Sequence, residues 1–176
     1  MTQQVGFRFV KTLFSFPNPV NEVSARLVAA GVVALTLVIL AFGQTWLIVP
    51  LAYGFVARAL TGPTLSPLGQ LATRVVTPAL PLAVREVPGP PKRFAQAIGA
   101  TLSVGAAVAH FGFGAPTLAV VLVGAITVAA SLEAAFGFCL GCKIFALLMK
   151  AGVIPESTCE ACNDLTLHRP AAAPAA

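Results

Sequence analysis

Charged residues are scarce in this chain: of its 176 residues only 10% are Asp, Glu, Lys or Arg, and six are acidic. An average soluble domain carries about 25% charged residues, so this chain cannot coat a soluble globule. The shortage excludes a typical soluble enzyme. The basic residues behind the net charge of +5 are too scattered for a nucleic-acid surface. With 57% hydrophobic residues and a mean hydropathy of +0.89, the composition is that of a membrane protein, whose first partner is the lipid bilayer.

Two long runs contain no charged residue at all, residues 27–57 and residues 94–132. One transmembrane helix needs about 20 residues, so each run is too long for one span. A turn signal stands near the middle of each run, at 42–45 and at 111–116. We therefore predict an all-α membrane domain over residues 23–138, built as two tight helical hairpins. Its four predicted spans are Val23–Phe42, Trp46–Leu60, Phe94–Phe111 and Pro116–Phe138.

The second of these spans is short because Arg58 lies near its end. An arginine at a helix end can extend its charged head to the interface, so we expect Arg58 to reach the membrane surface. A re-entrant or strongly tilted segment is the alternative for this part of the chain.

Basic residues are absent from both predicted hairpin turns, and in the four-span arrangement all eleven fall on one side of the membrane. The positive-inside rule then predicts a multi-pass protein of the bacterial inner membrane with both termini in the cytoplasm. The N-terminal segment 1–22 is predicted on that side, and so is a Pro-rich loop 61–93 with seven prolines. Proline at that density prevents a long helix, so we expect the loop to lie along the membrane surface.

Only four cysteines are present, and all lie in the last quarter of the chain. They form two CxxC pairs, Cys139 with Cys142 and Cys159 with Cys162. Four cysteines placed at random rarely form two such pairs, so the spacing indicates joint chemistry.

The pairs define a predicted cytoplasmic double-CxxC segment, residues 139–165. It begins with a short amphipathic helix over Cys142–Ala151, which Gly152 ends, and continues as a Cys-rich loop. The Pro/Ala-rich tail 166–176 is predicted to be disordered.

A redox dithiol is the first chemical interpretation of the four cysteines. The pKa of a thiol falls at a helix N-terminus and near a cation, and Cys139 and Cys142 are placed at a helix start beside Lys143. One of the two would attack and the other resolve. Cys159 and Cys162 would form the exchange partner.

A metal site built from the same four cysteines is the second interpretation. Two CxxC pairs separated by sixteen residues match the spacing of a four-thiolate zinc site, and an iron–sulfur cluster uses the same ligands and is less favoured. Four unrelated buried thiols and two structural disulfides are less favoured still, the disulfides because the cytoplasm is reducing.

Two stretches of the chain resemble the DUF4395 family of bacterial integral membrane proteins. These are Gly137–Phe145, followed by the Cys159–Cys162 motif, and Pro90–Gly99, and the resemblance spans roughly residues 17–165. The family has no assigned function and supplies no catalytic residue. The resemblance implies partners of the thioredoxin-like or rhodanese-like kind, and hence thiol or sulfur chemistry.

Glu133 is the only acidic residue inside a predicted span. An intramembrane carboxylate is either paired or functional. We expect an ion pair with Arg26, Arg58 or Arg93, and a proton relay to the thiols is the alternative.

The leading hypothesis is therefore an integral membrane protein whose double CxxC site works in thiol redox or sulfur transfer, as an oxidoreductase-like or sulfur-relay component. The first alternative is a membrane scaffold whose cysteines bind one structural zinc. The second is a transporter of a small sulfur species, which would need several copies of the chain to line a path.

Overall fold

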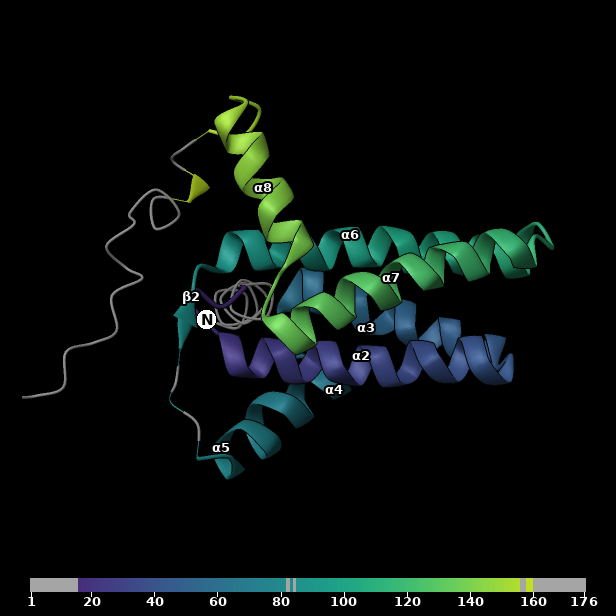
Figure 1. Cartoon of the computed structure of the whole chain (residues 1–176), viewed down its shortest axis with the longest axis horizontal. Helices are drawn as coiled ribbons and strands as arrows, with labels where there is room; N and C mark the ends of the chain where they lie inside the picture. The colour runs from purple at the N-terminus through teal and green to yellow at the C-terminus, as the bar shows by residue number, and fades with distance from the viewer. Residues whose placement is uncertain (1–15, 82, 84, 156–157, 160–176) are drawn as a thin grey trace, which may run out of the picture.

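The computed structural model describes residues 16–81, 83, 85–155 and 158–159, and its long helices run side by side along one axis (Figure 1). Two short turns join these helices at the same end of the bundle, and α8 (Leu140–Lys150) leaves the bundle near its other end. The bundle consists of α2 (Glu22–Phe42), the 3-10 turn η1 (Thr45–Leu47) with α3 (Ile48–Thr61), α6 (Gly89–Ala107) with the π-helical turn η3 (Val108–Gly112), and α7 (Pro116–Phe136).

Three helices of the described chain are long and apolar enough to cross a membrane: Glu22–Phe42, Gly89–Gly112 and Pro116–Phe136. A fourth apolar helix, Thr45–Thr61, is shorter. At about 1.5 Å per residue its 17 residues reach roughly 25 Å, against a hydrocarbon core of about 30 Å. The structure therefore shows a mostly helical protein with three candidate membrane spans, and the crossing of the fourth helix stays a prediction.

The first predicted hairpin is open rather than tight. Gly43, with φ 64°, ends α2 at the predicted turn, but α2 then packs mainly against α7, while α3 packs mainly against α6. A glycine explains the second contact, because a Cβ at Gly99 of α6 would lie 2.3 Å from Cε1 of Phe55 in α3. The two halves of the bundle therefore interlock instead of forming two separate hairpins.

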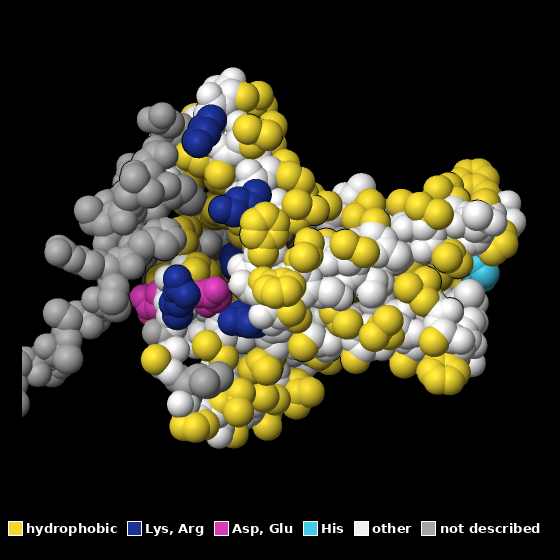
Figure 2. All heavy atoms as spheres, viewed as in Figure 1, with side chains coloured by type: hydrophobic (Ala, Val, Ile, Leu, Met, Phe, Trp, Pro, Cys, Tyr) yellow, Lys and Arg dark blue, Asp and Glu magenta, His cyan; other side chains and the backbone are white. Residues whose placement is uncertain are grey.

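Apolar side chains fill the core of the bundle and also cover its outside. Figure 2 shows hydrophobic side chains along the whole bundle, while Lys, Arg, Asp and Glu gather at the end that carries α8. An apolar outer surface suits contact with lipid. Small side chains among the buried residues let the helices approach closely, as in other membrane bundles. The core residues are Val32, Ile39, Ile48, Leu51, Phe55, Ala106, Ala109, Ala119, Val123, Ile126 and Ala130.

The Pro-rich loop contains more helix than its prolines predict. Three short helical segments follow one another without a break and pack against α2: α4 (Pro67–Gln70), the π-helical η2 (Leu71–Val76) and α5 (Thr77–Ala79). The first proline of this run lies at the helix start, behind the N-cap Ser66, where its missing N–H is not needed. Pro78 lies in the last turn, where little helix follows it.

Two short strands hold the beginnings of α2 and α6 together. In the antiparallel pair of β1 (Val20–Asn21) and β2 (Glu86–Val87), Val20 faces Val87 and Asn21 faces Glu86. An ion pair of 3.1 Å between Glu22 and Arg85 continues this contact. The sheet fixes where α6 starts.

The start of α6 differs from the prediction. The helix begins at Gly89 and not at Phe94, because Pro90 and Pro91 occupy its first turn, where proline is tolerated. Lys92 is therefore a helical residue and not part of a surface loop, and its residue is only 8% exposed.

Candidate functional site

The first CxxC pair lies at the junction of α7 and α8. Cys139 is the N-cap residue of α8, and Cys142 lies in the first turn of that helix. Both are free thiols, Cys139 buried and Cys142 half-buried. The helix predicted over Cys142–Ala151 is present as Leu140–Lys150, and Gly152 follows it with a φ of 73°.

The end of α7 determines where Cys139 sits. Gly137 adopts a φ of 67°, and a Cβ there would lie 2.9 Å from Oε1 of Glu22. Arg26 of α2 donates hydrogen bonds from Nη2 to the carbonyls of Ala134, at 3.1 Å, and Ala135, at 2.8 Å. These bonds satisfy carbonyls that the helix end leaves free, so α2 holds the junction in place.

Cys139 caps α8 through its sulfur. Its Sγ accepts a hydrogen bond from the backbone N–H of Cys142 at 3.4 Å, the position that a Ser or Asp oxygen takes in an ordinary N-cap. A helix N-terminus favours negative charge, which suits a thiolate. The pKa of Cys139 lies below the usual range of a thiol, chiefly because the Cys142 thiol hydrogen-bonds to it, and Lys92 acts in the same direction against burial and Glu133.

The pKa of Cys142 shifts in the opposite direction. Its pKa is raised, first because its thiol donates that hydrogen bond to Cys139 and then because it is partly buried. The dithiol is therefore asymmetric: the pKa of Cys139 is lowered and the pKa of Cys142 is raised, so ionisation is favoured at Cys139.

A glycine brings the dithiol close to α6. A Cβ at Gly141, between the two cysteines, would lie 2.6 Å from Cα of Ala95, so no side chain fits there. Lys143, the cation predicted beside the thiols, places its Nζ 5.7 Å from the centre of the Phe138 ring.

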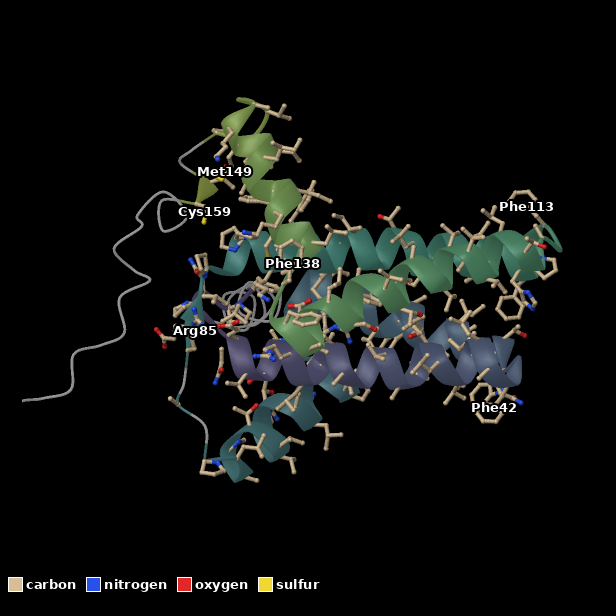
Figure 3. All side chains as sticks on the ribbon, viewed as in Figure 1. Phe42, Arg85, Phe113, Phe138, Met149 and Cys159 are labelled. Carbon is tan, nitrogen blue, oxygen red and sulfur yellow. The ribbon has the colours of Figure 1, made fainter. Side chains whose placement is uncertain are left out.

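Cys159 follows α8 in the chain and packs against another part of that helix. It is 4% exposed, packs with Phe145 and Met149, and is disulfide-bonded. Figure 3 shows it beside Met149. In the part of the chain that the structure describes, no three His, Cys, Asp or Glu side chains gather to hold a metal ion. Cys162 falls outside the described residues, so a four-thiolate site stays a prediction.

Glu133 has an ion-pair partner, but the predicted partner is wrong. Lys92 Nζ lies 2.5 Å from Glu133 Oε1, and both side chains are nearly buried, at 10% and 14% exposure. None of the three predicted arginines takes this place, because the early start of α6 turns Lys92 into the bundle.

Arg58, expected to extend its charged head outward from the helix end, is instead buried inside the protein. Arg58 is only 5% exposed, and its guanidinium lies 4.7 Å from the centre of the Phe55 ring. Nε donates to Oε1 of Gln96 at 2.8 Å, and Nη1 donates to Oγ of Ser66 at 3.1 Å. The short helix α3 thus carries a buried cation.

Sequence reasoning missed Lys92 and Gln96 as members of this site. They stand four residues apart, the spacing that places two side chains on one helix face. That signal was hidden because the helix was predicted to begin at Phe94.

Comparison with known proteins gives one match. The family model for a domain of unknown function, DUF4395, matches residues 20–150, somewhat less than the range 17–165 of the resemblance. No curated protein and no solved structure matches the chain. The matched range includes the bundle and the Cys139–Cys142 pair and ends before Cys159.

Proposed function

The chain belongs to the DUF4395 family, and we propose that it works in thiol redox or sulfur transfer through the Cys139–Cys142 dithiol. The observation that carries the proposal is the cap of α8, where Cys139 Sγ accepts the Cys142 N–H at 3.4 Å. At the same place the hydrogen bond from the Cys142 thiol lowers the pKa of Cys139, helped by Lys92 and by this cap, and the pKa of Cys142 is raised, which is what a nucleophile and a resolving thiol require.

In the redox reaction, the Cys139 thiolate attacks one sulfur of a substrate disulfide. A mixed disulfide forms, and the other substrate sulfur leaves as a thiolate. Cys142 then gives up its proton to a thiolate or to water and attacks Cys139 Sγ, which releases the second substrate sulfur. Two electrons pass from the dithiol to the substrate, and Cys139 and Cys142 end as a disulfide.

In sulfur transfer, the same thiolate attacks the terminal sulfur of a persulfide. The sulfur becomes bonded to Cys139, and the donor leaves as a thiolate, so no other oxidant is needed.

Cys159 and Cys162 are the proposed exchange partner of the first pair, and the disulfide at Cys159 supplies the oxidised group that disulfide exchange needs. A thioredoxin-like or rhodanese-like protein is the proposed partner.

The membrane arrangement that we propose has four spans, with the dithiol and both termini on the cytoplasmic side of a bacterial inner membrane. The clustering of charged side chains at the end of the bundle that carries α8 supports this orientation.

The pH dependence of Cys139 alkylation in two variants tests the chemistry. In Cys142→Ser the hydroxyl still donates to Cys139, whereas in Cys142→Ala the donor is lost. Since hydrogen bonding to the thiolate lowers the pKa of Cys139, we expect alkylation by iodoacetamide to need a higher pH in Cys142→Ala. Peptide mass spectrometry follows Cys139 alone. If Cys139 alkylates in both variants with the pH dependence of an ordinary thiol, the cap does not activate it and the proposal fails.

A further inference from the structure

A cavity inside the charged end of the bundle reaches the reactive cysteine. It has a volume of about 180 Å³, is partly open, and is lined by residues of α2, α3, α6, α7 and α8. Most of its wall is apolar, and its polar residues include Arg58, Gln96 and Glu133. Cys139 forms part of the same wall.

Arg58 brings a positive charge to this cavity and forms no ion pair with a described residue, and the carboxylate of Glu133 acts on it only from a distance. Its two hydrogen-bonded partners, Gln96 and Ser66, are both uncharged. The ion pairs in the described part of the chain are Glu22 with Arg85 and Lys92 with Glu133, so the carboxylate in the cavity wall is already matched by its own cation. Buried charges in proteins are normally paired, because an isolated buried charge is costly.

One nitrogen of Arg58 is also left without a hydrogen-bond partner. Among the described residues, Nη2 has none, although the side chain is buried. The guanidinium lies over the Phe55 ring. It also passes close to Gly54, where a Cβ would lie 3.2 Å from Nη1, so the absence of a side chain at Gly54 leaves room for it. The fold therefore fixes a buried charged side chain in the cavity wall, and its Nη2 amino group has no hydrogen-bond partner among the described residues.

We propose that this cavity binds a small anion, whose oxygen atoms accept hydrogen bonds from Arg58, and that this anion is the class of substrate presented to Cys139. An oxyanion or carboxylate head would lie at the guanidinium, and an apolar or sulfur-bearing remainder would fill the rest of the cavity. The role as a substrate rests on the proposed function of Cys139, whereas anion binding does not.

Two alkylating reagents of the same reactivity type test the site. Iodoacetate carries a carboxylate and iodoacetamide does not, so the ratio of their rates at Cys139 reports attraction of an anion. Changes in thiol pKa or access cancel to a large extent in this ratio. The full-length protein in a neutral detergent without added lipid is used, and peptide mass spectrometry follows Cys139.

We expect Arg58→Gln to lower the iodoacetate-to-iodoacetamide ratio by about tenfold, the effect of losing one hydrogen bond to a charged group. Arg58→Lys, which keeps the charge, should lose less. Arg74→Gln is the matched control, since Arg74 is exposed on η2 and does not line the cavity, and its ratio should equal that of the unchanged protein. An unchanged ratio in Arg58→Gln, with Cys139 still reactive, overturns the proposal.

Sulfate on the unchanged protein provides a second measurement, which does not depend on how Arg58→Gln folds. At constant ionic strength, sulfate should slow iodoacetate at Cys139 more than it slows iodoacetamide, and equal effects on the two reagents contradict the site. Neither measurement needs disulfide exchange. A Cys139 that never exchanges but shows the Arg58-dependent ratio removes the proposed function and leaves the anion site.

Discussion

At the scale of single residues, the site combines a dithiol with a buried ion pair. Lys92 and Glu133 form this ion pair, and both contribute to the electrostatics of Cys139, in opposite directions. The pair therefore keeps the charge near the thiol balanced, and removing one member leaves the other uncompensated.

Breaking this pair should destabilise the protein strongly. We expect Lys92→Met to cost about 3–5 kcal/mol of unfolding free energy, because it leaves Glu133 as a buried charge without a partner. The double variant Lys92→Met/Glu133→Gln removes both charges and should recover much of that loss. Unfolding in mixed micelles measures both. A double variant as unstable as Lys92→Met alone would show that lost packing, and not the unpaired carboxylate, sets the cost.

Only some of the residues that form the site could be predicted from the sequence. The cysteines and Glu133 stand out because their types are rare in the chain, and the structure places Cys139 and Cys142 together at a helix start as predicted. Lys92, Gln96 and the inward position of Arg58 were missed. Their positions depend on where α6 begins and on how α3 packs against α6, and neither follows from hydropathy alone.

At the scale of elements, composition does not decide whether α3 crosses the membrane. Its apolar stretch, with η1, is shorter than a usual span, and Arg58 is buried within it. Bundle neighbours can compensate for both, since the guanidinium finds partners inside the protein. Four-span topology requires that the two ends of this helix lie on opposite sides of the membrane.

Single-cysteine labelling tests this requirement. In a chain whose native cysteines are replaced by serine, Gln44→Cys precedes α3 and Leu65→Cys follows it, and both positions are exposed. An impermeant maleimide added to intact cells should label Gln44→Cys and should not label Leu65→Cys until the membrane is opened. Val153→Cys, which follows α8, is the control for the cytoplasmic side. Labelling of both positions from the same side would make α3 a re-entrant segment.

The boundaries of helices could be predicted from the sequence only where a glycine or proline acts locally. Gly43 and Gly152 adopt the positive φ values that end helices, as their positions indicate. The helical run over residues 67–79 was not predicted, because a count of prolines takes no account of where each proline falls in a helix. The sheet between β1 and β2 depends on pairing across the chain, for which two residues per strand give no periodic signal.

At the scale of the whole molecule, charge distribution was the most predictable feature. The charged side chains gather at one end of the bundle, and the dithiol lies at that end as well (Figure 2). The helical class and the membrane character follow from composition, because a chain this apolar must bury its backbone polar groups in helices. The interlocked packing of α2 with α7 and of α3 with α6 could not be predicted, since hydropathy does not say which spans touch.

The central claim is that Cys139 and Cys142 exchange electrons or sulfur as one unit. Mass spectrometry of the purified protein, alkylated after treatment with a graded series of dithiol and disulfide buffers and read together with its zinc content, tests this most directly. We predict that these two cysteines pass together between a dithiol carrying two alkyl groups and an unalkylated disulfide, without a bound zinc ion. Thiols that stay reduced across the whole series, with one zinc ion per chain, would contradict the claim.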